Sequence, residues 1–70
     1  MKKEVRITTE YINLGQFLKL TDHIGNGGEA RFFLMEERVL VNGEEETRRG
    51  RKLYPEDTVQ IKDQEYRVVK

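Results

Sequence analysis

Two consecutive segments of the sequence have the apolar spacing of helices, and short runs that alternate polar and apolar residues precede and follow them. This order of patterns is the feature that most constrains the fold. Residues 14–24 place one stripe of side chains at helical spacing. The stripe consists of Leu14, Phe17, Leu18, Thr21 and Ile24. Asn13 is the expected N-cap, because its side chain can accept a free N–H of the first turn. The glycine-rich residues 25–28 are expected to end this helix.

A second helix is predicted at about residues 28–37. Its buried stripe is formed by Ala30, Phe33 and Leu34. Asn26 and Glu29 are spaced like a capping box at its start. A helix this short is marginal alone, so it is expected to pack against the first.

The remaining apolar residues are typical of short strands. The expected strands span residues 4–8, 39–41, 58–62 and 65–69. Asn42 and Gly43 give the strongest two-residue hairpin signal, because both central positions of a type I′ turn need a positive φ. The predicted fold class is α+β, with two short packed helices against a small, mostly antiparallel sheet in the order β-α-α-β-β-β.

The residue types that are missing argue against several functions. The chain has no cysteine, which excludes a disulfide-stapled scaffold and a thiolate zinc site. It also has no serine, so the two commonest side-chain nucleophiles are absent. We therefore expect no enzyme, no catalytic residue, no metal and no cofactor. His23, the one histidine, is interpreted as a cation near the C-terminal end of the first helix.

The distribution of apolar residues predicts a cytoplasmic protein. The longest apolar run, residues 32–35, is far shorter than the ~20 residues that span a bilayer. No apolar stretch follows the basic N-terminus, so no signal peptide is expected. The sequence thus predicts one domain over residues 1–70, monomeric, with neither a membrane nor a small-molecule substrate as partner.

The charges cancel in total but are segregated along the chain. Thirteen Lys and Arg residues balance thirteen Asp and Glu residues. Residues 48–52 contain three arginines and a lysine around one glycine, whereas residues 44–46 are three glutamates that we expect to be solvated. Guanidinium groups suit phosphate because their fork donates two parallel hydrogen bonds. The alternative is that this basic segment simply pairs with the glutamates.

Two further positions are candidates for anion contact. Arg31 stands in the first turns of the second helix, where a cation does not favour the helix dipole but an anionic partner would explain it. Lys19 on the first helix is a candidate for the same side. The glycine-rich segment before the second helix is a place where one phosphate could rest against backbone N–H groups.

These residues together resemble the RNA-binding domain named after the fourth protein of the small ribosomal subunit, the S4 domain. The resemblance is carried by the Ala30-Arg31 pair, by residues 39–43 and by residues 53–61. It covers residues 12–62, and the whole chain is similar to the stand-alone YaaA-like proteins of Gram-positive bacteria. Where the family usually has glycine before Asp57, this chain has Glu56, which affects the geometry of that turn.

The resemblance implies a bacterial, non-catalytic protein that binds structured RNA. The expected partner is ribosomal RNA or a pre-ribosomal particle, with an implied role in ribosome biogenesis that extends to the large subunit. The implied RNA-binding residues are Lys19, Gly28, Arg31, Arg48, Arg49, Arg51 and Lys52. Charge reversal of Arg49 together with Arg51 is expected to abolish binding and leave the fold intact.

A protein-interaction module is the alternative function. In that case residues 48–52 dock on an acidic protein surface, and Phe32 and Met35 add apolar contacts. Ordinary packing is the simpler expectation for these two side chains, since a helix between a partner helix and a sheet buries a wide arc.

Overall fold

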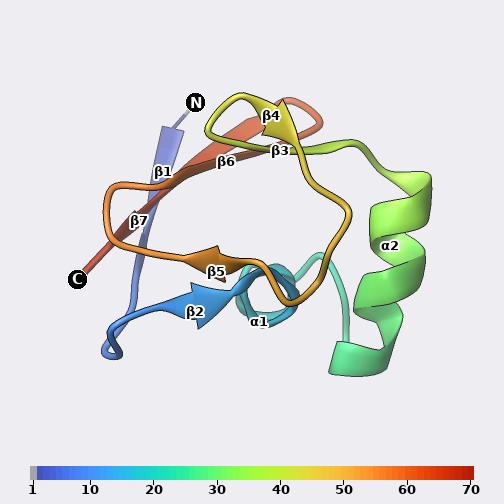
Figure 1. Ribbon diagram of the computed structural model, residues 1–70, viewed down its shortest axis with the longest axis horizontal. Helices are drawn as coiled ribbons and strands as arrows, with labels where there is room; N and C mark the ends of the chain where they lie inside the picture. The colour runs from blue at the N-terminus through green and yellow to red at the C-terminus, as the bar shows by residue number, and fades with distance from the viewer. Residues whose placement is uncertain (1) are drawn as a thin grey trace.

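The computed structural model describes residues 2–70 and places two short helices against one face of a five-stranded sheet (Figure 1). The strands are β1 (Lys2–Arg6), β2 (Ile12–Asn13), β3 (Val39–Val41), β4 (Glu44–Glu45), β5 (Lys52–Leu53), β6 (Thr58–Ile61) and β7 (Gln64–Val69). The helices are α1 (Leu14–Leu20) and α2 (Ala30–Glu36), the second preceded by the 3-10 turn η1 (Gly27–Glu29). The large sheet has the order β1-β7-β6-β3-β4, and β2 pairs with β5 in a separate ribbon.

The strand pairing confirms the α+β class. Strands β3, β4, β6 and β7 pair antiparallel, and only β1 pairs parallel, with β7. The β3–β4 turn has φ values of 52° at Asn42 and 87° at Gly43, both positive as predicted. Strands β2, β4 and β5 were not expected, because two residues are too few to show alternation.

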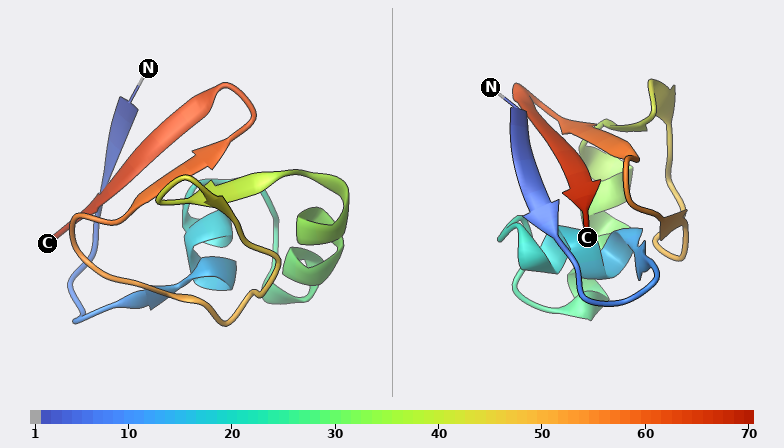
Figure 2. Two further views of the ribbon diagram at one scale, coloured as in Figure 1. Left: turned by 45° about the horizontal axis from the view of Figure 1, so that its top comes forward. Right: turned by 90° about the vertical axis from the view of Figure 1, so that its left-hand side faces the viewer.

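The core lies between the sheet and α1 (Figure 2). Phe17 of α1 packs edge-on against Tyr66 of β7, with ring centroids 5.5 Å apart. The largest fully buried side chains are Phe17, Leu14, Leu18, Leu53, Ile61, Val39, Val41, Val59 and Val68. Helix α2 lies beside α1, on the side away from β1. The predicted stripes therefore do face the core, although Phe33 is only half-buried.

Helix α1 ends earlier than predicted, at Leu20 and not at the glycine-rich segment. Asp22 takes a φ of 64°, in the left-handed region. The His23 N–H donates to the Leu18 carbonyl at 2.9 Å, and the Asp22 N–H donates to the Lys19 carbonyl at 3.1 Å. This is a Schellman motif with aspartate where glycine is usual, so the sequence gives little sign of it.

The interpretation of His23 as a helix-terminal cation is wrong. The ring is half-buried beyond α1, and its Nε2 shares a 2.9 Å hydrogen bond with the Tyr66 hydroxyl. Burial lowers the pKa of His23, and the charge of Lys62 lowers it further, while Asp22 opposes the change. The imidazole is therefore a neutral part of the packing between α1 and the sheet.

The second helical region starts with a displaced version of the expected capping box. Asn26 Oδ1 accepts from the Gly28 N–H at 2.9 Å, and Glu29 Oε1 accepts from the Gly25 N–H at 2.6 Å. The glutamate thus reaches one residue further back than in the usual motif. Both helices are short, and no helix within residues 2–70 is long and apolar enough to cross a membrane.

The turn between β5 and β6 holds Glu56 at a φ of 81°, where a side chain is strained. We expect Glu56→Gly to raise the free energy of unfolding by about 0.5–1 kcal/mol, because glycine adopts this conformation without a Cβ clash. The exposed ion pair with Arg67, 3.5 Å long, contributes little. Chemical denaturation measures the change. Glu65→Gly, at an exposed position of β7, is the control and should lower the free energy of unfolding. If Glu56→Gly lowered it by a similar amount, the backbone at Glu56 would not be strained.

Candidate nucleic-acid interface

Residues 48–52, here called the basic loop, are fastened to the start of α1 by their own carbonyl groups. The Leu14 N–H donates to the Arg51 carbonyl, and the Gly15 N–H donates to the Arg49 carbonyl, each at 2.8 Å. The first N–H groups of a helix have no partner within the helix. The loop supplies two of those partners, which fixes its backbone relative to α1.

The third partner comes from Asn13, whose Oδ1 accepts from the Gln16 N–H at 2.8 Å, which confirms the predicted N-cap. A Cβ at Gly15 would lie 3.5 Å from the Arg49 carbonyl oxygen and 3.6 Å from the Ala30 Cβ, both ordinary contact distances. The basic loop, α1 and α2 therefore meet at this glycine, and an anion placed here would have to be held by side chains because the first N–H groups of the helix are occupied.

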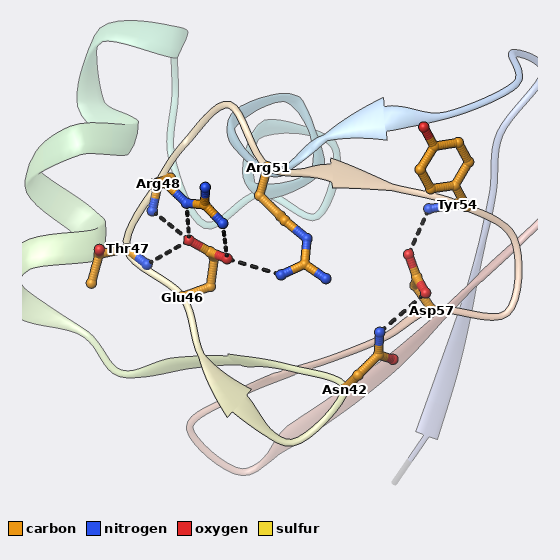
Figure 3. A network of polar contacts seen from close by, with 7 residues as sticks. All are labelled: Asn42, Glu46, Thr47, Arg48, Arg51, Tyr54 and Asp57. Carbon is orange, nitrogen blue, oxygen red and sulfur yellow. Dashed lines mark hydrogen bonds and ion pairs between the residues drawn. The ribbon is translucent and has the colours of Figure 1, made fainter.

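Glu46, expected to be solvated, is instead 7% exposed and anchors the basic loop (Figure 3). Its Oε2 accepts from the backbone N–H groups of Thr47 and Arg48 at 3.2 and 3.0 Å, and from Arg48 Nε at 2.9 Å. Its Oε1 accepts from Arg48 Nη2 at 3.2 Å and from Arg51 Nη1 at 2.9 Å. The expected pairing between the basic segment and the acidic run thus occurs, but through Glu46 alone.

These contacts change the charge available to a ligand. The hydrogen bond from Arg48 is the largest of the causes that lower the pKa of Glu46, from 4.5 to about 2, against the opposing effect of burial. The same bond raises the pKa of Arg48. Because a buried carboxylate partly neutralises Arg48 and Arg51, their attraction for phosphate is weaker than the sequence indicated.

Lys19 and Arg49 have no such restraint. Both side chains are exposed, and within residues 2–70 neither takes part in an ion pair. They lie on one shallow depression at the junction of α1, η1 and the basic loop. Its lining residues are Asn13, Gly15, Gln16, Lys19, Gly27, Arg49 and Gly50. The structure thus brings together two predicted cations that are thirty positions apart.

A second depression lies on the other side of the basic loop. It is lined by Arg48, Gly50, Arg51, Lys52, Tyr54 and Asp57. Arg31 is exposed on α2 but lines neither depression. Gly28 is exposed in η1, and its N–H, the group expected to face a phosphate, is already donated to Asn26. The predicted residues therefore do not form one continuous cluster.

The sequence reasoning missed an aromatic pair beside the second depression. Pairing of β2 with β5 brings Tyr11 and Tyr54 together, with ring centroids 5.7 Å apart. The side chains are 41% and 44% exposed. Lys52 Nζ lies over the Tyr11 ring, 5.0 Å from its centroid. No local signal predicted this arrangement, since it depends on two strands of two residues each.

Asn42 and Asp57 join two turns near this pair (Figure 3). Asn42 Nδ2 donates to Asp57 Oδ1 at 3.1 Å, and the Tyr54 N–H donates to Asp57 Oδ2 at 2.8 Å. The Thr58 N–H donates to Asn42 Oδ1 at 2.9 Å. The asparagine and aspartate that carried the family resemblance thus hold the β3–β4 and β5–β6 turns against each other.

Comparison with known proteins shows the family of this chain. A family model described as the S4 domain matches residues 5–69, beyond residues 12–62 at both ends. The chain is 57% identical over 61 residues to the "Probable ribosome maturation protein RlbA" of Bacillus subtilis (strain 168), an alignment that covers 87% of this chain and 86% of that protein. The resemblance seen in the sequence is therefore confirmed, and the chain belongs to the S4-domain family.

Proposed function

We propose that this S4-domain protein binds structured ribosomal RNA without catalysing a reaction. The observation that carries the proposal is the depression shared by Lys19 and Arg49. Double-helical RNA is read mainly through its shape, its phosphates and its 2′-hydroxyl groups. An ammonium and a guanidinium group on a fixed backbone suit two phosphates of such a duplex. Lys52 and Arg31 would extend the contact to either side.

We further propose that the bound RNA belongs to an immature ribosomal particle, that of the large subunit in particular. The printed name of the B. subtilis relative, a probable ribosome maturation protein, supports the first part of this proposal. The chain would act as a monomer and without a cofactor. The lining of the two depressions supports a binding role, because it is rich in Lys, Arg, Gly and amide groups, which suit phosphate oxygens.

The salt dependence of binding tests the phosphate contacts. Each neutralised phosphate releases counterions, so contact with about four phosphates gives a slope of log K against log salt on the order of −3 to −4. Fluorescence anisotropy with labelled fragments of bacterial ribosomal RNA measures this slope. A slope near zero, or no binding at low salt, would exclude the proposed mode.

The protein-interaction alternative gains support from one observation. Phe32 and Met35 were expected to pack, but they are 62% and 75% exposed on α2. The expectation was wrong because α2 packs through Ala30 and Leu34 and leaves the neighbouring arc uncovered. An exposed apolar pair next to a cation such as Arg31 is compatible with a protein surface as partner.

A pull-down from bacterial lysate with and without nuclease treatment separates the two functions. Loss of ribosomal components after nuclease treatment is the result expected for RNA binding. Partners that survive nuclease treatment, and that are lost from a Phe32→Ser, Met35→Ser variant, would instead support the protein-interaction module. The Lys19→Glu, Arg49→Glu variant provides the matched comparison for the RNA surface.

A further inference from the structure

We propose that Tyr54, with Tyr11 beside it, forms a stacking site for one unpaired nucleobase, adjacent to the phosphate contacts of the basic loop. The inference rests on the proposed RNA-binding function and narrows the class of RNA, because it requires a nucleotide that is not base-paired. It also gives the second depression a role distinct from that of the depression at Lys19 and Arg49.

The rings of Tyr11 and Tyr54 are exposed to solvent. A chain of seventy residues has few large apolar side chains with which to build a core, yet Tyr11 and Tyr54 are 41% and 44% exposed. Their rings are tilted by 47° and touch each other, so they form a small apolar surface that solvent reaches. Tyrosine of this kind is typical of sites that are apolar on one side and wet on the other.

Positively charged side chains lie around the two rings. Lys52 Nζ already lies over the Tyr11 ring, which leaves Tyr54 as the more open platform. Tyr54 is one of the residues that line the same depression as Arg48, Arg51 and Lys52. Cations that follow a phosphate backbone, combined with an aromatic face on which a base stacks, are the two elements with which proteins hold single-stranded nucleic acid.

Hydrogen bonds hold the backbone of Tyr54 in place. Asp57 accepts from the Tyr54 N–H at 2.8 Å, and the Asp57 N–H donates back to the Tyr54 carbonyl at 3.0 Å. Asn42 binds the same aspartate from the β3–β4 turn. Pro55, the next residue, restricts φ at its own position. The Tyr54 backbone is therefore fixed before any ligand arrives.

An unpaired base is the ligand that this chemistry selects. Bases in a duplex are already stacked on their neighbours and do not offer a free face, whereas a bulged or looped base can be turned out against an aromatic side chain. The tyrosines should therefore add affinity for an RNA with an unpaired base and none for a fully paired one. That difference separates their role from that of the phosphate contacts.

The experiment compares two RNA hairpins, one fully paired and one identical except for a single unpaired adenosine. We expect the native protein to bind the second about 10-fold more tightly, as is typical for one stacked base. Tyr54→Leu should lose this preference and keep its affinity for the paired hairpin, and Tyr54→Phe should retain both. Phe32→Leu, an exposed aromatic of α2 on the far side of α1 from the β2–β5 ribbon, is the control (Figure 1).

A second measurement does not depend on any variant folding. A fluorescent adenine analogue at the unpaired position should change its emission when the native protein binds, because stacking on an aromatic ring quenches it. Equal affinity of the native protein for both hairpins, or an unaltered preference in a folded Tyr54→Leu variant, would overturn the stacking site. Failure of the RNA-binding function looks different: neither hairpin binds, and Lys19→Glu with Arg49→Glu has no effect.

Discussion

Lys19→Glu combined with Arg49→Glu is expected to weaken RNA binding by more than about 100-fold, because two charge-assisted contacts are each replaced by a repulsion. Both side chains are exposed and lie on one depression. The free energy of unfolding should stay within about 0.5 kcal/mol of the native value, as is usual for exposed positions. Filter binding with ribosomal RNA fragments measures the first quantity, and denaturant unfolding measures the second.

The control for this prediction carries the same change in net charge elsewhere. Lys3→Glu with Arg38→Glu reverses two exposed cations, one on β1 and one between α2 and β3. If binding depended only on net charge, both double variants would lose the same affinity, and the assignment of the site to Lys19 and Arg49 would be wrong. If RNA binding is weakened only in the Lys19→Glu, Arg49→Glu variant, the assignment of the site to these two residues is supported.

Glu46→Ala has the second large expected effect, a loss of about 2–3 kcal/mol in the free energy of unfolding. The substitution frees the N–H groups of Thr47 and Arg48 and removes the shared partner of Arg48 and Arg51. The estimate lies below that for a fully buried pair because the Arg48 side chain is 75% exposed and solvent screens it. Urea denaturation followed by circular dichroism measures the change.

Glu45→Ala provides the comparison, since Glu45 is the neighbouring glutamate on β4 and is exposed. We expect a change within about 0.5 kcal/mol for it. If Glu46→Ala lowered the free energy of unfolding no more than Glu45→Ala does, the contacts of Glu46 would make no measurable contribution to stability. The cluster also shows why charge reversal at Arg51 is a poor test of RNA binding. Arg51→Glu would place a second carboxylate against the buried one, so we expect this substitution to destabilise the fold, in place of leaving it intact.

The same carboxylate makes stability depend on pH in the acid range. The folded-state pKa of Glu46 is lowered from 4.5 to about 2, so its contribution is complete above about pH 4.5 and is lost as the pH falls toward 2. Glu46→Gln removes the titrating group. In that variant this part of the acid loss should disappear, which unfolding curves recorded across the window would show.

Local signals predicted much of the fold. Asn13 accepts from an N–H of the first turn, and the Asn42-Gly43 turn takes the φ values that its sequence requires, because both depend only on neighbouring residues. The end of α1 was missed because Asp22 adopts a conformation that glycine usually supplies. The three conspicuous glycines of residues 25–28 offered a more obvious but incorrect end point.

The candidate site was harder to predict, since it is made by contacts between distant segments. Glu46 looks like its two neighbours in the sequence, and it is buried only because the basic loop folds over it. The meeting of Lys19 with Arg49 follows from the hydrogen bond between Gly15 and the Arg49 carbonyl, which no local pattern encodes. Residue types alone therefore indicated the arginines as candidates. They could not show which of these arginines are held by Glu46 and which are not.

The carbonyl groups of Arg49 and Arg51 complete the first turn of α1, and this ties the folding of two segments together. A helix of seven residues does not persist alone in water. Formation of the helix and closure of the basic loop therefore stabilise each other. The conformational entropy of the loop backbone is lost when the chain folds, so an RNA that docked there, as proposed, would meet a preorganised surface and need not order it.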